Sequence, residues 1–556
     1  MTPADLSAAV VEALQGLVDD GSLALPDGVP AEVTIERPRQ QGHGDYATNV
    51  AMQLAKRAGT NPRALGELLA ERLRARDGVE AVEVAGPGFL NLTVAAGAQG
   101  EVARQVVAAG AAYGRTDVLA GQRIDVEFIS ANPTGPLHLG HTRWAVMGDA
   151  IARVLASAGA DVVREFYIND RGNQMDLFGA SIEARALGQE VPEGGYQGDY
   201  VHDLARRVLD AHPGILDLPA DERRLAFRER GYELQLAEQR AQLDGFNTHF
   251  DVWFSERSLH EGDVATGLEK LRAQGHLFDD DGALWMRTTD FGDDKDRVLI
   301  RSNGELTYFA SDTAYYVNKR ERGFDRCLYL LGADHHGYVG RLKAMAACAG
   351  DDPEQTLDVL IGQLVKILQD GEELRLSKRA GNIVALQELV DLIGVDALRY
   401  SLARYPCDTP LTLDVAEITK ASNDNPVYYV QYAHARTCRM TANAADLGMV
   451  APQGDDFDPS LLSHPRDGEL LRALAEFPAV VASAADLREP HRVARYLEAT
   501  ASVFNKWYDT DECRMLPKGD EPVRPANLAR LLLVGAARTV LANGLDLLGV
   551  SAPERM

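Results

Sequence analysis

Cysteine is scarce in this sequence. Five cysteines occur in 556 residues, an odd number with no CxxC pair, which argues against both a disulfide framework and a zinc ribbon. We therefore expect reduced thiols that are mostly buried. The five positions are Cys327, Cys348, Cys407, Cys438 and Cys513.

Long apolar runs are also missing. No uninterrupted apolar stretch approaches the ~18 residues of a membrane span. The N-terminus, MTPADLSAAVVEAL, contains Asp5 and lacks the basic segment of a secretory signal. These features predict a cytoplasmic protein.

Positive charge is in deficit. Lys and Arg number 57 against 83 Asp and Glu, a net charge of -26 at pH 7. Indiscriminate nucleic-acid binding usually leaves a basic footprint, so this class is disfavoured, although an acidic body can still carry a local basic groove. The length predicts about three domains, because single cores stop growing near ~250 residues.

The most informative segment is ANPTGPLHLGH at residues 131–141. It follows a strand-like run at 124–129 and leads into a helix-like stretch at 142–158. At a helix N-terminus His138 and His141 can face one side, where the helix dipole favours a polyanion. Gly135 and Gly140 let phosphate approach the backbone. The pattern predicts an ATP site.

Two histidines three residues apart have simpler explanations. A surface pair or half of a metal site is the commoner reason for HxxH alone. No Cys-rich segment or HExxH motif completes a metal site here, and the flanking strand and turn favour nucleotide binding.

The longer segment EFISANPTGPLHLGH, residues 127–141, resembles the signature of class I aminoacyl-tRNA synthetases, and of the arginyl-tRNA synthetase family in particular. The resemblance extends from about residue 32 to the terminal SAPERM. It implies activation of arginine by ATP, with Mg²⁺ accompanying the ATP, followed by transfer to the 3′-terminal adenosine of tRNA(Arg). His138 and His141 would be catalytic, and Pro136 and Gly140 would contact ATP.

A second phosphate loop is expected at RLSKR, residues 375–379, which is similar to the KMSKS loop of these enzymes. Lys378 stands at the second lysine of that motif and would stabilise charge developing at the α-phosphate. Arg375 replaces the first lysine, and Arg375 and Ser377 would contact ATP. A basic surface turn is the alternative explanation.

The segment GADHHG, residues 332–337, follows an apolar run and therefore ends a strand. In class I folds this place lies near the adenosine, so Asp334, His335 and His336 are candidate ribose or base contacts. A metal pair and an unspecific turn are the alternatives.

Recognition of arginine calls for carboxylates that can hold a planar guanidinium. Tyr308 and Asp312 lie four residues apart, on one face of a predicted helix. By resemblance these two residues and Glu256 hold the side chain, while Asn132 and Glu127 address the amino-acid end.

Each of these arginine-binding candidates has an ordinary alternative. Asp312 could cap a helix, Tyr308 could pack in the core, and Glu256 could pair with Arg257 or Lys270.

The predicted fold is α/β. It consists of a small α/β N-terminal domain at 1–100, a Rossmann-like parallel-sheet catalytic domain at 115–406 with an insertion at about 185–290, and an all-α anticodon-binding domain at 407–556. The first unit alternates helices at 6–17 and 62–75 with strands at 32–37 and 79–84. GDYATN at 44–49 and GPGFLN at 86–91 are similar to the tRNA-contacting N-terminal domain of the family.

GVDALRYSLARY, residues 394–405, resembles the DALR sequence of the family's anticodon-binding domain. In the following predicted helix Tyr428, Tyr432 and Arg436 form a stripe that could stack with unpaired tRNA bases. A core stripe with an extended arginine is the alternative.

Two rival functions are weighed against the synthetase. A nucleotidylyltransferase can also carry HxGH and a basic loop, but it does not need the two tRNA-binding domains. A synthetase-derived RNA-binding or regulatory protein that has lost catalysis has no physical reason to keep His138, His141, Lys378 and Asp312. A paralogue that supplies arginine to a small molecule or resists an arginine-like inhibitor stays an open alternative. A monomer is the simplest expectation for the assembly.

Overall fold

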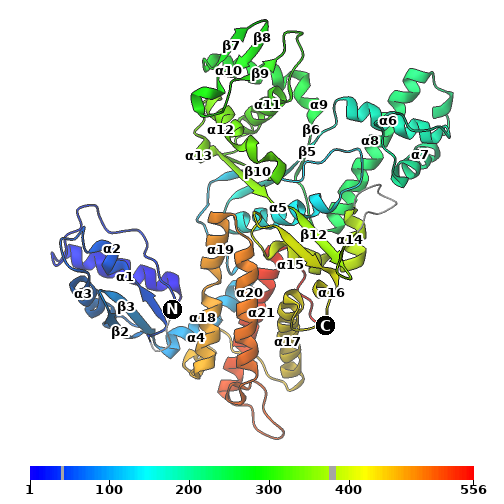
Figure 1. The fold of residues 1–556 in the computed structure, drawn as a ribbon. Helices are drawn as coiled ribbons and strands as arrows, with labels where there is room; N and C mark the ends of the chain where they lie inside the picture. The colour runs from blue at the N-terminus through cyan, green and yellow to red at the C-terminus, as the bar shows by residue number, and fades with distance from the viewer. Residues whose placement is uncertain (39–42, 375–383) are drawn as a thin grey trace.

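The computed structural model describes residues 1–38, 43–374 and 384–556. Figure 1 shows an N-terminal unit at the left, a long helical bundle at the bottom, a sheet with helices above it and a helical lobe at the right. The candidate site residues lie on the sheet with its helices, and the HLGH turn among them contacts the helical lobe.

The N-terminal unit is a three-stranded antiparallel sheet, in the order β1-β3-β2, covered by helices. The expected strand at 32–37 is wrong, because only Glu36 makes an isolated bridge, to Ala47. The elements are α1 (Pro3–Asp19), β1 (Tyr46–Thr48), α2 (Val50–Leu54), α3 (Pro62–Arg74), β2 (Val79–Ala85) and β3 (Phe89–Val94).

This unit is tied to the helical bundle. The Asp45 carboxylate, in GDYATN, accepts a hydrogen bond from Arg472 at 2.7 Å, and Arg37 pairs with Glu476. The link between the two parts is α4 (Ala96–Ala109), which packs on α18 and α21, with η1 (Gly110–Ala112) after it.

The central sheet has five parallel strands in the order β11-β10-β4-β5-β6. The strand order reverses beside β4, because the chain continues to β5 on one side and returns with β10 on the other. A crevice at such a switch point is where ligands bind in open α/β sheets. The strands are β4 (Arg123–Glu127), β5 (Asp161–Ile168), β6 (Val252–Ser255), β10 (Arg326–Gly332) and β11 (Leu357–Gly362).

The chain leaves this sheet in two excursions, so the range 185–290 contains β6, a strand of the central sheet. The first excursion is the helical lobe of α6 (Asn173–Ala186), α7 (Asp199–Ala211), η2 (Ile215–Asp217) and α8 (Ala220–Gly245). The second contains α9 (Glu256–Ser258), η3 (Leu259–Asp263), α10 (Val264–Ala273), β7 (Leu277–Asp280), β8 (Ala283–Met286), η4 (Thr288–Phe291) and β9 (Arg297–Ile300).

Helices flank the sheet and carry the candidate site residues. The helix α5 (Leu139–Ser157) follows the HLGH turn, and α11 (Tyr308–Glu321) carries the expected arginine contacts. The remaining elements here are η5 (Ala333–Tyr338), α12 (Val339–Cys348) and α13 (Pro353–Thr356).

A small mixed sheet, β13-β12-β14, joins the catalytic part to the bundle. The strand β14 lies inside the range 407–556, for which an all-α domain was expected. The elements are β12 (Val365–Gln369), β13 (Glu372–Glu373), α14 (Leu386–Ile393), α15 (Val395–Ala403), β14 (Leu411–Asp414) and α16 (Val415–Ile418).

The C-terminal bundle is built around long antiparallel helices, and its apolar core is continuous with that of the central sheet. Its helices are α17 (Pro426–Asp446), η6 (Gly454–Asp456), η7 (Pro459–Leu461), α18 (Pro465–Ala475), α19 (Phe477–Leu487), α20 (His491–Tyr508), η8 (Asp511–Cys513) and α21 (Pro525–Leu547). Within the described residues α21 is long and apolar enough to cross a membrane, but its apolar stretch is 61% buried, as in a core helix.

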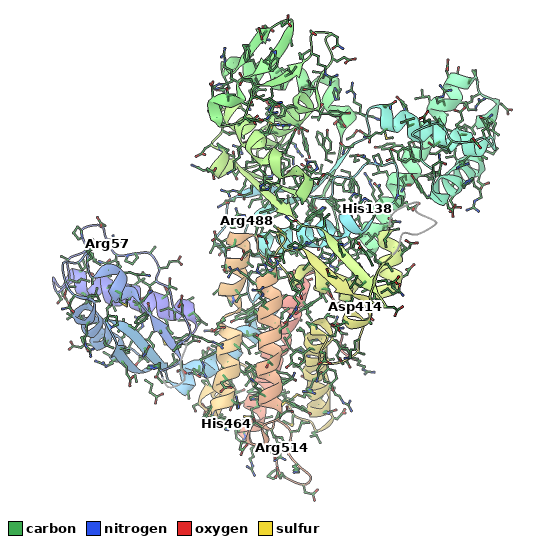
Figure 2. All side chains as sticks on the ribbon, in the orientation of Figure 1. Arg57, His138, Asp414, His464, Arg488 and Arg514 are labelled. Atoms are coloured by element: carbon green, nitrogen blue, oxygen red, sulfur yellow. The ribbon has the colours of Figure 1, made fainter. Side chains whose placement is uncertain are left out.

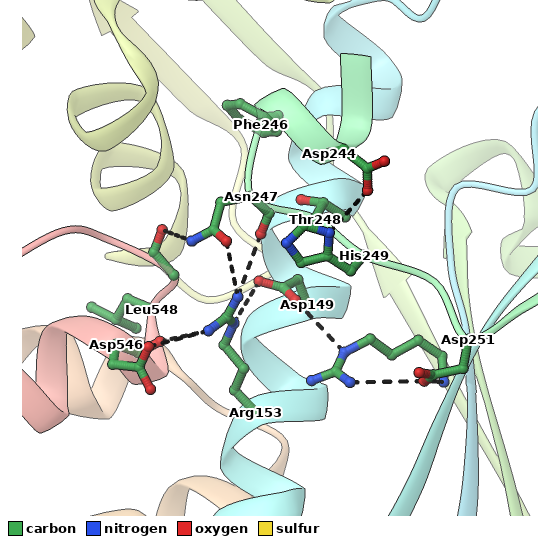
Figure 3. Close-up of polar contacts among 12 residues, drawn as sticks. Asp149, Arg153, Asp244, Phe246, Asn247, Thr248, His249, Asp251, Asp546 and Leu548 are labelled. Carbon is green, nitrogen blue, oxygen red and sulfur yellow. Dashed lines mark hydrogen bonds and ion pairs between the residues drawn. The ribbon is translucent and has the colours of Figure 1, made fainter. Parts of the chain in front are cut away.

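Figure 3 shows the polar junction between α5 and the end of the bundle. Asp149 of α5 lies beside Arg153, which reaches Asn247 and Asp546. The Asn247 amide donates to the Gly549 carbonyl at 2.9 Å. The helix that follows the HLGH turn is therefore anchored, at its far end, to the last helix of the bundle.

Candidate active site

The HLGH turn forms the N-terminus of α5. His138 is the N-cap residue, with extended backbone, and its Nδ1 accepts from the Gly140 amide at 3.2 Å. The His138 amide donates to Nδ1 of His141 at 3.3 Å. The ring centroids are 3.8 Å apart. The expected placement of both histidines at one helix start is confirmed, and Figure 2 labels His138 beside the helical lobe.

The backbone bonds fix the proton on each ring. Because both Nδ1 atoms accept, the neutral rings carry their proton on Nε2. Burial lowers the pKa of His138, and burial with the neighbouring His138 lowers the pKa of His141 to about 3. At neutral pH the pair therefore presents two uncharged N–H donors rather than two cations.

The helical lobe and α14 hold the turn in place. Gln239 of α8 donates to the carbonyls of Asn132 and Gly135, at 3.1 and 2.8 Å. The Tyr200 hydroxyl donates to the Thr134 carbonyl at 2.9 Å. On the other side the Leu139 amide donates to the Val384 carbonyl. Several elements therefore fix the shape of a loop rich in glycine and proline.

The turn GADHHG leaves the end of β10, next to β4 in the sheet. Asp334, His335 and His336 are exposed there, and Asp334 lies 3.3 Å from the His335 ring. Both turns thus open at the carboxyl ends of neighbouring strands, as adenosine contacts require. Among the described residues no group of three or more His, Cys, Asp and Glu side chains could hold a metal ion.

Two carboxylates from different elements lie near one another. Asp312 lies on α11 and Glu256 starts α9 after β6. Burial, then Asp170 and Asp312, raise the pKa of Glu256 to about 7, although Arg171 opposes the shift. Burial, reinforced by Glu127, raises the pKa of Asp312 to about 6 despite a hydrogen bond from Tyr338. These acids repel one another.

The ordinary alternatives for these residues do not fit the structure. Arg257 contacts Asp170 and Glu229, and Lys270 lies near Glu321. Among the described ionisable side chains, the one at ion-pairing distance from Glu256 is the His260 ring, at 4.0 Å.

The helix position of the other two residues also excludes their alternatives. Asp312 is the fifth residue of α11, whose N-cap is Thr307. Tyr308 is 84% exposed rather than in the core. Both side chains are therefore available to a ligand.

Glu127 and Asn132 already have protein partners. Glu127 lies 2.6 Å from the ammonium of Lys319 and accepts from Ser130 at 2.9 Å. The Asn132 amide donates to Gln174 at 2.9 Å. The charge of Glu127 raises the pKa of Asp312, whereas no contact among the described residues places Asn132 against Asp312 or Glu256.

A buried lysine under the site was missed by the sequence analysis. Lys319 has no exposed surface and faces the carboxylates of Asp125, Glu127 and Glu165. Its only signal in the sequence was its position seven residues after Asp312, on the same helical face. The Lys319 ammonium offsets the negative charge of these three carboxylates, which lie on β4 and β5.

The backbone between Glu127 and the turn is strained. Ile129 and Ser130 have φ values of 70° and 45°, in the left-handed region. This conformation is rare for a β-branched residue. Such strain clusters at ligand sites, and here it lets the Ser130 hydroxyl fold back onto Glu127.

The candidate tRNA stripe lies on α17. The Tyr428 and Tyr432 rings stack at 5.9 Å, and the Arg436 guanidinium lies 4.9 Å from the Tyr432 ring and 4.5 Å from the Tyr508 ring. Tyr432 and Arg436 border a cleft of about 1150 Å³ that also involves η8 and residues 554–556. All three side chains of the stripe are half-buried. Arg375, Ser377 and Lys378 lie outside the described residues.

Three family descriptions match the chain. "Arginyl tRNA synthetase N terminal domain" matches residues 4–94, "tRNA synthetases class I (R), catalytic domain" matches 104–200 and 222–436, and "DALR anticodon binding domain" matches 430–556. Together with the parallel sheet and its HLGH turn, they define a class I aminoacyl-tRNA synthetase.

Relatives identify the family within this class. Arginine–tRNA ligases from Paenarthrobacter aurescens and Kineococcus radiotolerans are each 55% identical to the chain, with both chains covered completely. The chain belongs to the arginyl-tRNA synthetase family, and it is an ATP-dependent ligase for arginine and tRNA. The arginyl-tRNA synthetase of Thermus thermophilus has the same fold, with a TM-score of 0.74 at 24% identity over 100% of both chains.

Proposed function

We propose that the chain arginylates tRNA(Arg) in two steps with the residues assigned below. The arginine carboxylate attacks the α-phosphate of ATP, which gives arginyl-adenylate and diphosphate. The 3′-terminal adenosine of the tRNA then accepts the arginyl group and AMP leaves. No protein nucleophile is needed, since the substrate carboxylate forms the new bond to phosphorus.

Arginine recognition rests on one observation above all. Glu256 is buried and Asp312 is half-buried. Both carboxylates lack a protein cation at ion-pairing distance among the described residues, and both have raised pKa values. A guanidinium that enters between them supplies the missing positive charge and donors for both. Tyr308 covers this space from the solvent side, and Glu127 and Asn132 address the amino-acid end.

ATP is bound between the two turns. The Nε2–H groups of His138 and His141 donate to phosphate oxygens, and Pro136 and Gly140 line the approach. Asp334, His335 and His336 contact the adenosine. Arg375, Ser377 and Lys378 bind the phosphates from the RLSKR segment, with Lys378 stabilising the charge that develops at the α-phosphate. Mg²⁺ arrives with ATP and is held mainly by phosphate oxygens.

We assign tRNA binding outside the active site to the N-terminal and C-terminal domains. Residues 1–100 form the N-terminal tRNA-binding domain, 115–406 the catalytic domain and 407–556 the anticodon-binding domain. Tyr428, Tyr432 and Arg436 offer a stacking surface beside the cleft in the last of these. The enzyme acts as a cytoplasmic monomer.

Charging of total tRNA by the purified protein tests this proposal. Labelled arginine and Mg-ATP should give acid-stable label, and each other amino acid should not. Binding of RNA without charging would instead favour a regulatory or inhibitor-resistant paralogue. Sedimentation of the same sample tests the monomer, because a dimer would sediment as a species of twice the mass.

A further inference from the structure

The two candidate substrate sites share one side chain, Tyr338. This residue ends η5, the turn that carries His335 and His336, and begins the approach to α12. Its hydroxyl donates a hydrogen bond to Oδ2 of Asp312 on α11. The expected adenosine turn therefore contacts the expected arginine carboxylate directly.

The phenol is held in this position from its other side. The Arg341 guanidinium lies 4.6 Å from the Tyr338 ring centroid. The Arg341 Nε is buried and has no hydrogen-bond partner among the described residues, and the charge of Arg341 opposes the rise in the pKa of Tyr338. His335 approaches the edge of the same ring at 6.4 Å.

We propose that Tyr338 is a positioning and specificity-determining residue for arginine, which occupies one oxygen of Asp312 so that the other is aimed at the incoming guanidinium. The inference rests on the proposed role of Asp312 as an arginine ligand. Tyr338 itself touches neither reacting atom.

The hydrogen bond has two physical consequences. A carboxylate fixed through one oxygen loses little further rotational freedom when the second accepts an N–H from the ligand. A donor also favours the ionised form of the acid, which a cationic substrate needs. The bond therefore counters the burial and acidic neighbours that favour the protonated form of Asp312.

The pH behaviour of Asp312 depends on every charged or titratable group that faces it. These groups are Glu127 at the end of β4, Tyr167 on β5, Glu256 on α9, His335 and Tyr338 on η5, and Arg341 on α12. Among the neighbours that favour ionisation, Tyr338 is the one that donates a hydrogen bond to the carboxylate.

The test is Tyr338→Phe in the full-length enzyme, which removes one oxygen and keeps the ring under Arg341. The arginine KM should rise by roughly tenfold or more, the usual cost of a hydrogen bond to a charged group. The KM for ATP should stay within about twofold. Loss of the donor should also raise the pKa of Asp312, so the acid limb of the kcat/KM profile for arginine should move to higher pH. We expect a shift of about one pH unit when it is measured in a Glu256→Gln background, where the other titrating acid is absent.

Tyr316→Phe is the matched control. Tyr316 lies on α11, the helix that carries Asp312, and also donates to a carboxylate, that of Asp351 at 2.8 Å, but away from the site. Its loss should leave the arginine KM and the pH limb unchanged. Thermal unfolding of both variants reports any general loss of structure.

Asp312→Asn separates failure of this inference from failure of the proposed site. If Asp312→Asn leaves the arginine KM unchanged, the site assignment is wrong and the role of Tyr338 is wrong with it. If Asp312→Asn raises the KM sharply while Tyr338→Phe moves neither the KM nor the pH limb, only the inference about Tyr338 is overturned.

Discussion

Arg399 of the DALR-like helix forms a buried ion pair with Asp149 of the helix that follows the HLGH turn. Its guanidinium also donates to the carbonyls of Phe246 and Leu548, at 2.9 and 3.1 Å. One side chain without exposed surface thus joins α15, α5, the end of α8 and the segment after α21. The motif that names the anticodon-binding domain is, in this chain, also a junction.

Replacement of Arg399 by Met should destabilise the protein by about 2–4 kcal/mol, because several buried acceptors lose their donor together. Urea unfolding at pH 7.5 measures the effect. Arg206→Met is the control, since Arg206 forms an exposed pair with Asp203 on α7 and should change little. Equal midpoints for both variants would contradict the junction.

Arginine affinity should depend on pH through the two acids. Both must be ionised to hold a cation, and their pKa values in the free protein are about 7 for Glu256 and about 6 for Asp312. The value of kcat/KM for arginine should therefore fall as the pH drops from 8 to 5.5, with a slope that approaches two. Glu256→Gln should reduce that slope toward one. A flat wild-type profile would exclude both acids from the site.

Ionised Glu256 should lower the stability of the fold at alkaline pH. Glu256 ionises near 4.5 when unfolded but near 7 in the fold, so its contribution favours the folded state below 4.5 and is lost as the pH rises through 7. Glu256→Gln should raise the free energy of unfolding by about 1–3 kcal/mol at pH 8. No such gain is expected at pH 4.5. Similar gains at both pH values would point to packing instead of ionisation.

The two histidines should act as neutral donors. Replacement of either by Ala should lower kcat by about 10²- to 10³-fold, whereas Asn, which keeps an N–H, should recover part of the loss. Since the pKa of His141 is about 3, its protonation should not appear in the kcat profile between pH 5.5 and 8. A kcat that rises on acidification would show that the charged form is the active one.

The stripe on α17 should contribute to tRNA binding alone. Tyr432→Ala and Arg436→Ala should each raise the KM for tRNA by roughly 5- to 100-fold, the cost of a lost base stack, with the KM values for arginine and ATP unchanged. Phe291→Ala removes an exposed aromatic from the second excursion and should have no effect. An unaltered KM for tRNA in both stripe variants would mean that the stripe is only core packing.

Local sequence signals predicted the parts of the site that local chemistry determines. The strand, turn and helix around His138 and His141 carry their own glycine, proline and capping pattern, and the spacing of Tyr308 and Asp312 follows from one helix. Lys319 contacts Glu127, which lies 192 residues away in the sequence, and Tyr338 contacts Asp312, which lies 26 residues away; a short window of sequence contains neither pair. The strand expected at 32–37 did not form for the same reason, because whether a segment pairs in a sheet depends on the strand beside it.

The junction around Arg399 also sets an order in time. Its acceptor in Leu548 is made 149 residues later, and ribosomes add about 5–20 residues per second. For roughly 7–30 s after Arg399 is made, its guanidinium therefore lacks the Leu548 carbonyl, because that residue has not yet been synthesised. The junction that fastens the catalytic half to the bundle is therefore completed only after the end of the anticodon-binding half has been made.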